Sequence, residues 1–186
     1  CLTPVASLAV LIVTLLGSGI NLPFFILKIQ HTGHLVALPG RKPIWELFQP
    51  VREGCTVIAI NVGGCVIPVG LCVYFISLQL IEPLLLGVAI LIIAGLSYRL
   101  SRPVPGLGIA MPLFIAPLAS ALLALILDPA HAAHLAYIGG VLGVLIGADM
   151  LHLKSVGSLG VPVASIGGAG TFDGIFLTGI IAALLA

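Results

Sequence analysis

The chain has 186 residues, of which 60% are hydrophobic and only 7% are charged, with a formal net charge of +1. Soluble domains carry about 25% charged residues, so this composition excludes a soluble globular enzyme and a disordered chain. The net charge offers no basic surface, and we expect no nucleic-acid partner. The composition predicts an all-α, polytopic membrane helical bundle that forms a single integral membrane domain over residues 1–186.

Six apolar stretches predict transmembrane spans. They cover residues 5–27, 55–80, 83–98, 107–127, 132–151 and 172–186. Glycine, asparagine and proline interrupt several of these stretches, so broken or re-entrant segments are expected within the bundle. The short third span and the faces rich in small residues favour a homo-oligomer.

The charged residues divide cleanly between the connections of this six-span arrangement. All seven Lys and Arg lie in the first, third and fifth connections, whereas the second and fourth carry Glu82 and Asp128. Positively charged loops of membrane proteins stay in the cytoplasm. The partition therefore predicts a cytoplasmic segment over residues 28–54 and both termini outside. The sequence thus predicts a multi-pass protein of the cell membrane, with membrane lipid as a partner.

Asp149 and Asp173 fall inside predicted spans, where a carboxylate is costly and marks a functional site. At about 1.5 Å of rise per residue, they lie roughly 22 Å and roughly 20 Å from the outer surface. Two carboxylates held close at matched depth share a proton, so one activates water while the other protonates a carbonyl. The pair predicts an aspartyl dyad that cleaves a membrane-embedded peptide substrate without a cofactor or metal.

Other polar and small residues are expected to complete this site. Gly167, Gly168 and Gly170 precede Asp173 and leave room for a substrate backbone. Asn61, in the second span, is expected to line the cavity that faces the two carboxylates. The alternative for Asn61 is one hydrogen bond between closely packed helices.

Two further interpretations stay open for the carboxylates. Asp149 and His152 are three residues apart, a spacing that places both on one helix face and suits a cation. With Asp173 they predict a small proton or divalent-cation transporter, with His31 and His34 as further ligands. Alternatively, each Asp has a structural role, by pairing with Lys154 or by capping a helix. Such structural roles would suffice in a non-catalytic assembly factor, which is a third possible function.

Three stretches look like the domain of unknown function 1614 family of small bacterial and archaeal membrane proteins. They are INVGGCVIP at 60–68, LIGADMLHL at 145–153 and GGAGTFDGIFLTG at 167–179. The third is similar, more distantly, to the GxGD signature of intramembrane aspartyl proteases, such as presenilin, signal peptide peptidase and the prepilin peptidases. That resemblance implies catalytic roles for Asp149 and Asp173. Thr171 and Phe172 stand between Gly170 and Asp173, where the signature has no intervening residue.

Overall fold

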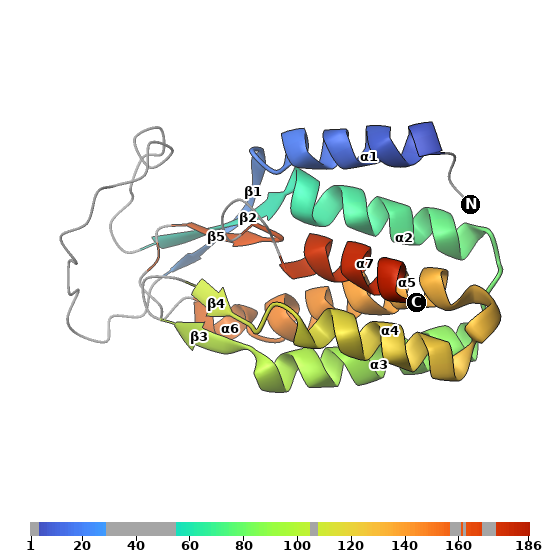
Figure 1. The fold of residues 1–186 in the computed structure, drawn as a ribbon. Coiled ribbons are helices and arrows are strands. Elements are labelled where there is room, and N and C mark those ends of the chain that lie inside the picture. The colour runs from blue at the N-terminus through green and yellow to red at the C-terminus, as the bar shows by residue number, and fades with distance from the viewer. Residues whose placement is uncertain (1–3, 29–54, 105–107, 157–160, 162, 169–173) are drawn as a thin grey trace.

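Apolar helices packed side by side make up most of the structure, and two small sheets lie at one end of them (Figure 1). This computed structural model describes residues 4–28, 55–104, 108–156, 161, 163–168 and 174–186. The mostly helical fold agrees with the expected bundle. The strands are a departure from the all-α fold that the composition predicted.

The elements follow one another with short connections in most of the described chain. The first part contains α1 (Pro4–Gly17), β1 (Asn21–Lys28), β2 (Cys55–Asn61), the π-helix η2 (Val62–Val66), α2 (Ile67–Ser77) and α3 (Pro83–Leu100). The second part contains β3 (Arg102–Val104), β4 (Gly108–Ala110), α4 (Ile115–Leu127), the 3₁₀ turn η3 (Pro129–His131), α5 (Ala132–Val144), the π-helix η4 (Leu145–Met150), α6 (Leu153–Val156), β5 (Val163–Ile166) and α7 (Gly174–Leu185).

Two of the expected spans are continuous helix along their length. Residues 83–98 lie within α3, and residues 132–150 form α5 and η4. Helix α3 begins at Pro83, directly after the extended Glu82. A proline suits this first position because its missing N–H has no helical partner there and its φ angle is already helical.

The expected spans at 5–27 and 55–80 are helical only in part. Helix α1 ends at Gly17 and residues 21–28 form β1, while residues 55–61 form β2 ahead of the helices η2 and α2. Pro23 disfavours helix at the residue before it, and the β-branched residues of β2 suit an extended strand. In the span expected at 107–127, residues 108–110 form β4 and the helix starts at Ile115.

Three strands from distant parts of the sequence form the larger sheet, in the order β1-β2-β5. Strands β1 and β2 are antiparallel, with Asn21 opposite Asn61, and β2 and β5 are parallel, with Ile60 opposite Ile166. Because parallel strands end at the same edge of a sheet, the residues that follow β2 and β5 lie close together. The smaller sheet pairs β3 with β4.

Helix α5 lies at the centre of the bundle and contacts α2, α3, α4 and α7. Leu135, Ile138 and Val141 are fully buried along it. A helix that is apolar on every side must be covered, either by other parts of the protein or by a membrane. Helix α5 therefore holds the bundle together.

Glycines let α3 approach α5 closely. Gly139, Gly143 and Gly147 are four residues apart on α5 and η4, so they share one face. A Cβ on Gly143 would lie 2.7 Å from the Cβ of Ile93, and one on Gly147 would overlap the carbonyl oxygen of Ala94. Small residues at this spacing are typical of closely packed membrane helices.

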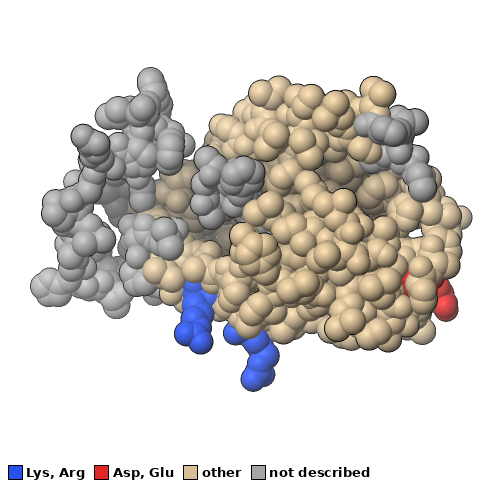
Figure 2. All heavy atoms as spheres, in the orientation of Figure 1, with Lys and Arg blue, Asp and Glu red and all other residues tan. Residues whose placement is uncertain are grey.

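The outer surface of the helices is strongly apolar. On α3 and α4, Leu84, Leu91, Leu122 and Ile126 are all more than 60% exposed. Figure 2 shows almost no charged side chain over the helical body on the face it displays. An apolar surface of this extent marks contact with a membrane or another protein.

Two helical segments are long and apolar enough to cross a membrane. They are Pro83–Leu100 and Pro129–Met150, and four shorter apolar helices lie among the described residues. Two such helices are weak evidence for insertion, because a buried core helix of a soluble protein has the same length and composition. The helices therefore agree with a membrane location.

The close contact of Gly139, Gly143 and Gly147 with α3 gives a stability prediction. Replacing Gly147→Ala forces a methyl group against the backbone of Ala94, so we expect the free energy of unfolding to fall by about 1–3 kcal/mol. The matched control is Gly95→Ala on α3, where an added Cβ meets no atom within 4 Å. Thermal unfolding of the purified chain measures both variants, and equal stability of the two would contradict the close approach.

Candidate functional site

Asp149 lies on the π-helix η4, which continues α5 towards the sheets. Its side chain is half-buried, between the buried Ala148 and the exposed Met150. Short π-helical segments are rare and occur often at functional sites, because the wider turn displaces side chains from the regular helical positions. The local backbone therefore marks Asp149 as a candidate functional residue.

Helix α7 packs against α5 in the opposite direction. A Cβ on Gly140 would lie 3.0 Å from Cγ2 of Thr178. Nearer the start of α7, the buried Ile175 belongs to the same hydrophobic cluster as Val144 and Ala148. The first turn of α7 therefore packs beside the end of α5 and the start of η4. Asp173, the second predicted catalytic residue, lies outside the described residues.

Asn61 is almost fully buried at the end of β2, and its amide joins three segments. Its Nδ2 donates to the carbonyl oxygen of Ser18 at 2.7 Å and to Oδ1 of Asn21 at 3.0 Å, and its Oδ1 accepts from the backbone N–H of Gly64 at 2.7 Å. Ser165 on β5 donates to the same Asn21 oxygen at 2.6 Å. The Asn61 amide thus ties the end of α1 and the start of β1 to η2.

The predicted glycines Gly167 and Gly168 lie directly beside this amide. Gly167 has a φ of +73°, which favours glycine, and a Cβ there would lie 2.7 Å from the backbone carbon of Gly64. A Cβ on Gly168 would lie 3.0 Å from that of Asn61. The structure thus brings together Asn61, Gly167 and Gly168, whereas Gly170 lies outside the described residues.

His152 is fixed by contacts with backbone and with an aromatic ring. Its Nδ1 lies 3.2 Å and 3.1 Å from the carbonyl oxygens of Gly147 and Ala148, so this nitrogen carries the proton. The ring also stacks against Tyr98 on α3, with centroids 4.7 Å apart. His31 and His34 lie outside the described residues. Within the part of the chain that is described, no three His, Cys, Asp or Glu side chains form a metal site.

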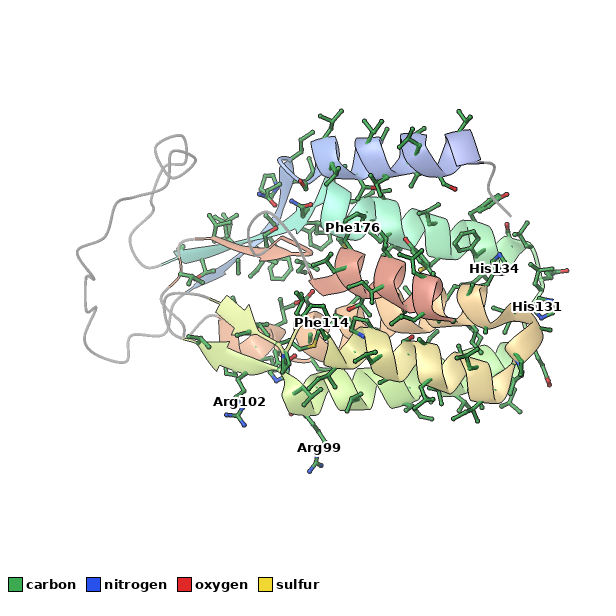
Figure 3. All side chains as sticks on the ribbon, viewed as in Figure 1. Arg99, Arg102, Phe114, His131, His134 and Phe176 are labelled. Atoms are coloured by element: carbon green, nitrogen blue, oxygen red, sulfur yellow. The ribbon has the colours of Figure 1, made fainter. Side chains whose placement is uncertain are left out.

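A further polar pair lies at the far end of the bundle. Nδ1 of His131 is 3.0 Å from Oδ2 of Asp128. Figure 3 shows His131 and His134 at the end of the helices away from the sheets. This pair is remote from η4 and Asn61, so it supplies no group to the candidate site.

Comparison with known families adds one finding to this geometry. A family model described as protein of unknown function (DUF1614) matches residues 15–185. The chain belongs to the DUF1614 family. The match includes η2, η4, β5 and α7, which are the elements that form the candidate site.

No curated protein and no solved structure matches this DUF1614 chain. These comparisons do not show the expected similarity to GxGD proteases, which stays a prediction from the motif residues. Two members of the candidate site lay outside the sequence-based prediction, namely Asn21 and Ser165. Their only sequence signal is a polar side chain within a largely apolar stretch, and their pairing depends on strands that are far apart in the chain.

The Asn61 network gives a second stability prediction. Replacing Asn61→Ala leaves the N–H of Gly64 and the carbonyl of Ser18 without these partners, so we expect a loss of about 1–3 kcal/mol in the free energy of unfolding. Ser18→Ala is the control, because its exposed hydroxyl bonds only within its own turn, to Leu15. A thermal unfolding temperature of Asn61→Ala no lower than that of the control would contradict the structural role.

Proposed function

We propose that the chain is a multi-pass protein of the cell membrane, with six spans, cytoplasmic basic loops and both termini outside. The apolar outer faces of α3 and α4 support this, because exposed apolar surface of this kind suits contact with lipid. Arg99 and Arg102 lie towards the sheets, whereas His131 lies at the other end (Figure 3). Helix α1 begins and α7 ends towards that second end (Figure 1), which is consistent with the proposed topology.

Within this membrane protein we propose an intramembrane aspartyl protease that uses Asp149 and Asp173. The observation that supports the pairing is the antiparallel packing of α7 on α5, which brings the first turn of α7 beside η4. Asp149 lies on η4, and Asp173 directly precedes Gly174, the first residue of α7. A shared proton requires the two carboxylates to lie close together, and this short distance is part of the proposal.

The proposed reaction consumes one water for each peptide bond. One carboxylate takes a proton from water while the water oxygen attacks the peptide carbonyl carbon, and the protonated partner gives its proton to the carbonyl oxygen. The gem-diol then returns one proton to the dyad as the C–N bond breaks. The amine leaves with a proton from the dyad, and the pair again holds one shared proton.

Gly167, Gly168, Gly170 and Asn61 are the proposed substrate-binding residues. Among the described residues, Gly167, Gly168 and Asn61 pack against one another and against Gly64 and Cys65, so the space left by the missing side chains is filled by η2. Access of a substrate backbone beside these residues is part of the proposal and rests on the sequence motif. An unwound segment of backbone is stable at membrane depth only where protein surrounds it or it lines a water-filled cavity. Such a cavity would also admit the water that the reaction consumes.

Substitution of the two carboxylates tests the reaction. The purified chain is incubated in detergent micelles with a quenched fluorescent peptide that contains one apolar span. We expect cleavage to fall about 10²- to 10⁴-fold in Asp149→Asn and in Asp173→Asn, because each removes a proton-transfer group. The control is Asp128→Asn, whose side chain pairs with His131 away from the site. Unchanged cleavage in either dyad variant would overturn the proposal.

A cysteine pair tests the geometry without requiring a substrate. In a background without the native cysteines, Asp149→Cys with Asp173→Cys is expected to form a disulfide under mild oxidation. Disulfides need Cα atoms about 4.4–6.8 Å apart. The control pair is Asp128→Cys with Asp173→Cys, for which we expect no intramolecular bond. Gel mobility before and after reduction reports whether a disulfide has formed. If the first pair does not link, positions 149 and 173 are too far apart for a dyad, and the proposal is overturned.

One observation favours cation transport as a second candidate. Because Nδ1 of His152 donates to backbone carbonyls, Nε2 is the nitrogen that can face a cation, as in many histidine metal ligands. Asp149 and Asp173 would then be its oxygen ligands. Zinc binding measured by calorimetry, lost in His152→Gln but kept in His131→Gln, would favour this function over proteolysis.

A further inference from the structure

Three basic side chains lie exposed at the sheet end of the bundle, and we call them the basic patch. The basic patch consists of Arg99 at the end of α3, Arg102 at the start of β3 and Lys154 on α6. Figure 3 shows Arg99 and Arg102 projecting from the same side of the molecule. In Figure 2 basic side chains protrude from the lower edge of the displayed face, and acidic ones lie at its right end.

Close packing holds these three residues on neighbouring elements. The rings of Tyr98 and His152 stack with centroids 4.7 Å apart, which fixes the end of α3 against the turn that leads to α6. Arg99 directly follows Tyr98, and Lys154 is two residues after His152. This contact places α6, which carries Lys154, beside the end of α3, although more than fifty residues separate Lys154 from the two arginines in the sequence.

The basic patch has no acidic partner within the described residues. The ion pair found there joins His131 to Asp128 at the other end of the bundle. Exposed positive charges attract an anion, and several cations on one side of the molecule attract it more strongly than one.

The patch also borders an apolar surface. Leu91 and Ile92 are exposed on α3, and Tyr98, at the end of the same helix, is 48% exposed. A tyrosine between apolar side chains and basic residues is the usual order at the edge of a bilayer. An anion that binds here would therefore carry its charge beside an apolar portion.

We propose that the basic patch binds the phosphate headgroup of an anionic phospholipid, with the acyl chains along the exposed face of α3. This inference rests on the membrane location proposed above and is independent of the Asp149–Asp173 dyad. Arg99 and Arg102 can each donate paired hydrogen bonds to phosphate oxygens, and Lys154 adds a point charge. A soluble anion would gain the charge contacts but not the apolar contact with Leu91 and Ile92.

Lipid titration of the full chain tests the proposal. The protein in uncharged detergent micelles is titrated with phosphatidylglycerol or with phosphatidylcholine of the same acyl chains, and bound lipid is counted by native mass spectrometry. We expect phosphatidylglycerol to bind at least about tenfold more tightly, because each basic residue near an anionic headgroup contributes about 1 kcal/mol, or about fivefold in affinity. Equal binding of the two lipids would overturn the proposal.

Variants of the basic patch locate the binding. Changing Arg99→Gln, Arg102→Gln and Lys154→Gln together is expected to weaken phosphatidylglycerol binding about 100-fold, whereas phosphatidylcholine binding stays the same. The matched control changes Arg99→Lys and Arg102→Lys, keeps the charge and is expected to stay within about fivefold of the parent chain. Thermal unfolding checks that both variants fold. Unchanged phosphatidylglycerol binding in the triple variant would place the lipid elsewhere and overturn the proposal.

Two further measurements separate the remaining outcomes. Inorganic phosphate at millimolar concentration is expected to leave phosphatidylglycerol bound, and complete displacement would make the patch a plain phosphate site. Alkaline carbonate extraction of cell membranes tests the location itself, and we expect the chain to stay with the membranes. Release of the chain by carbonate would contradict the membrane location and overturn this inference. A failure to detect peptidase activity would overturn only the proposed protease function and would not affect the lipid site.

Discussion

The close approach of α3 to α5 is the constraint on which the remaining structure depends. Gly143 and Gly147 remove the side chains that would otherwise separate the two helices. As a result η4 lies directly against α3, and Tyr98 reaches the ring of His152. The half-buried Asp149 is carried on the same turn. The position of the candidate site therefore follows from the close contact between the backbones of α3 and α5. The polar side chains of Asp149 and His152 lie at one end of this contact.

Sequence patterns predicted the central helices well but not the strands. Helices α3 and α5 follow from long apolar runs with few interruptions, which have the length to form membrane-crossing helices. Residues 55–61 are just as apolar, and a short apolar run is consistent with either a strand or a buried helix. Its strand conformation depends on β1 and β5 as partners, and β5 lies about a hundred residues away.

Some members of the candidate site could be selected from the sequence. Asp149 and Asn61 could be selected because polar side chains are unusual in an apolar stretch, and Gly167 and Gly168 because they lie in the motif that precedes Asp173. Their arrangement could not, because the hydrogen bonds of Asn61 reach Ser18, Asn21 and Gly64 on three different segments. The roles of Ser165 and Asn21 likewise arise only from strand pairing. Residue type was therefore enough to select candidate residues, but tertiary contacts determine which of them lie together.

The parallel pairing of β2 with β5 has a consequence for the order of assembly. Thr56 donates a hydrogen bond to the carbonyl oxygen of Val161, a contact between residues separated by 105 positions. Contacts between such distant residues form late, because closing a long loop costs chain entropy before the contact is gained. During synthesis, α3, α4 and α5 are complete before β5 exists. The glycines that follow β5 thus reach their neighbours only after α3, α4 and α5 have been made. A chain released from the ribosome before β5 would have these three helices but would lack this site and α7.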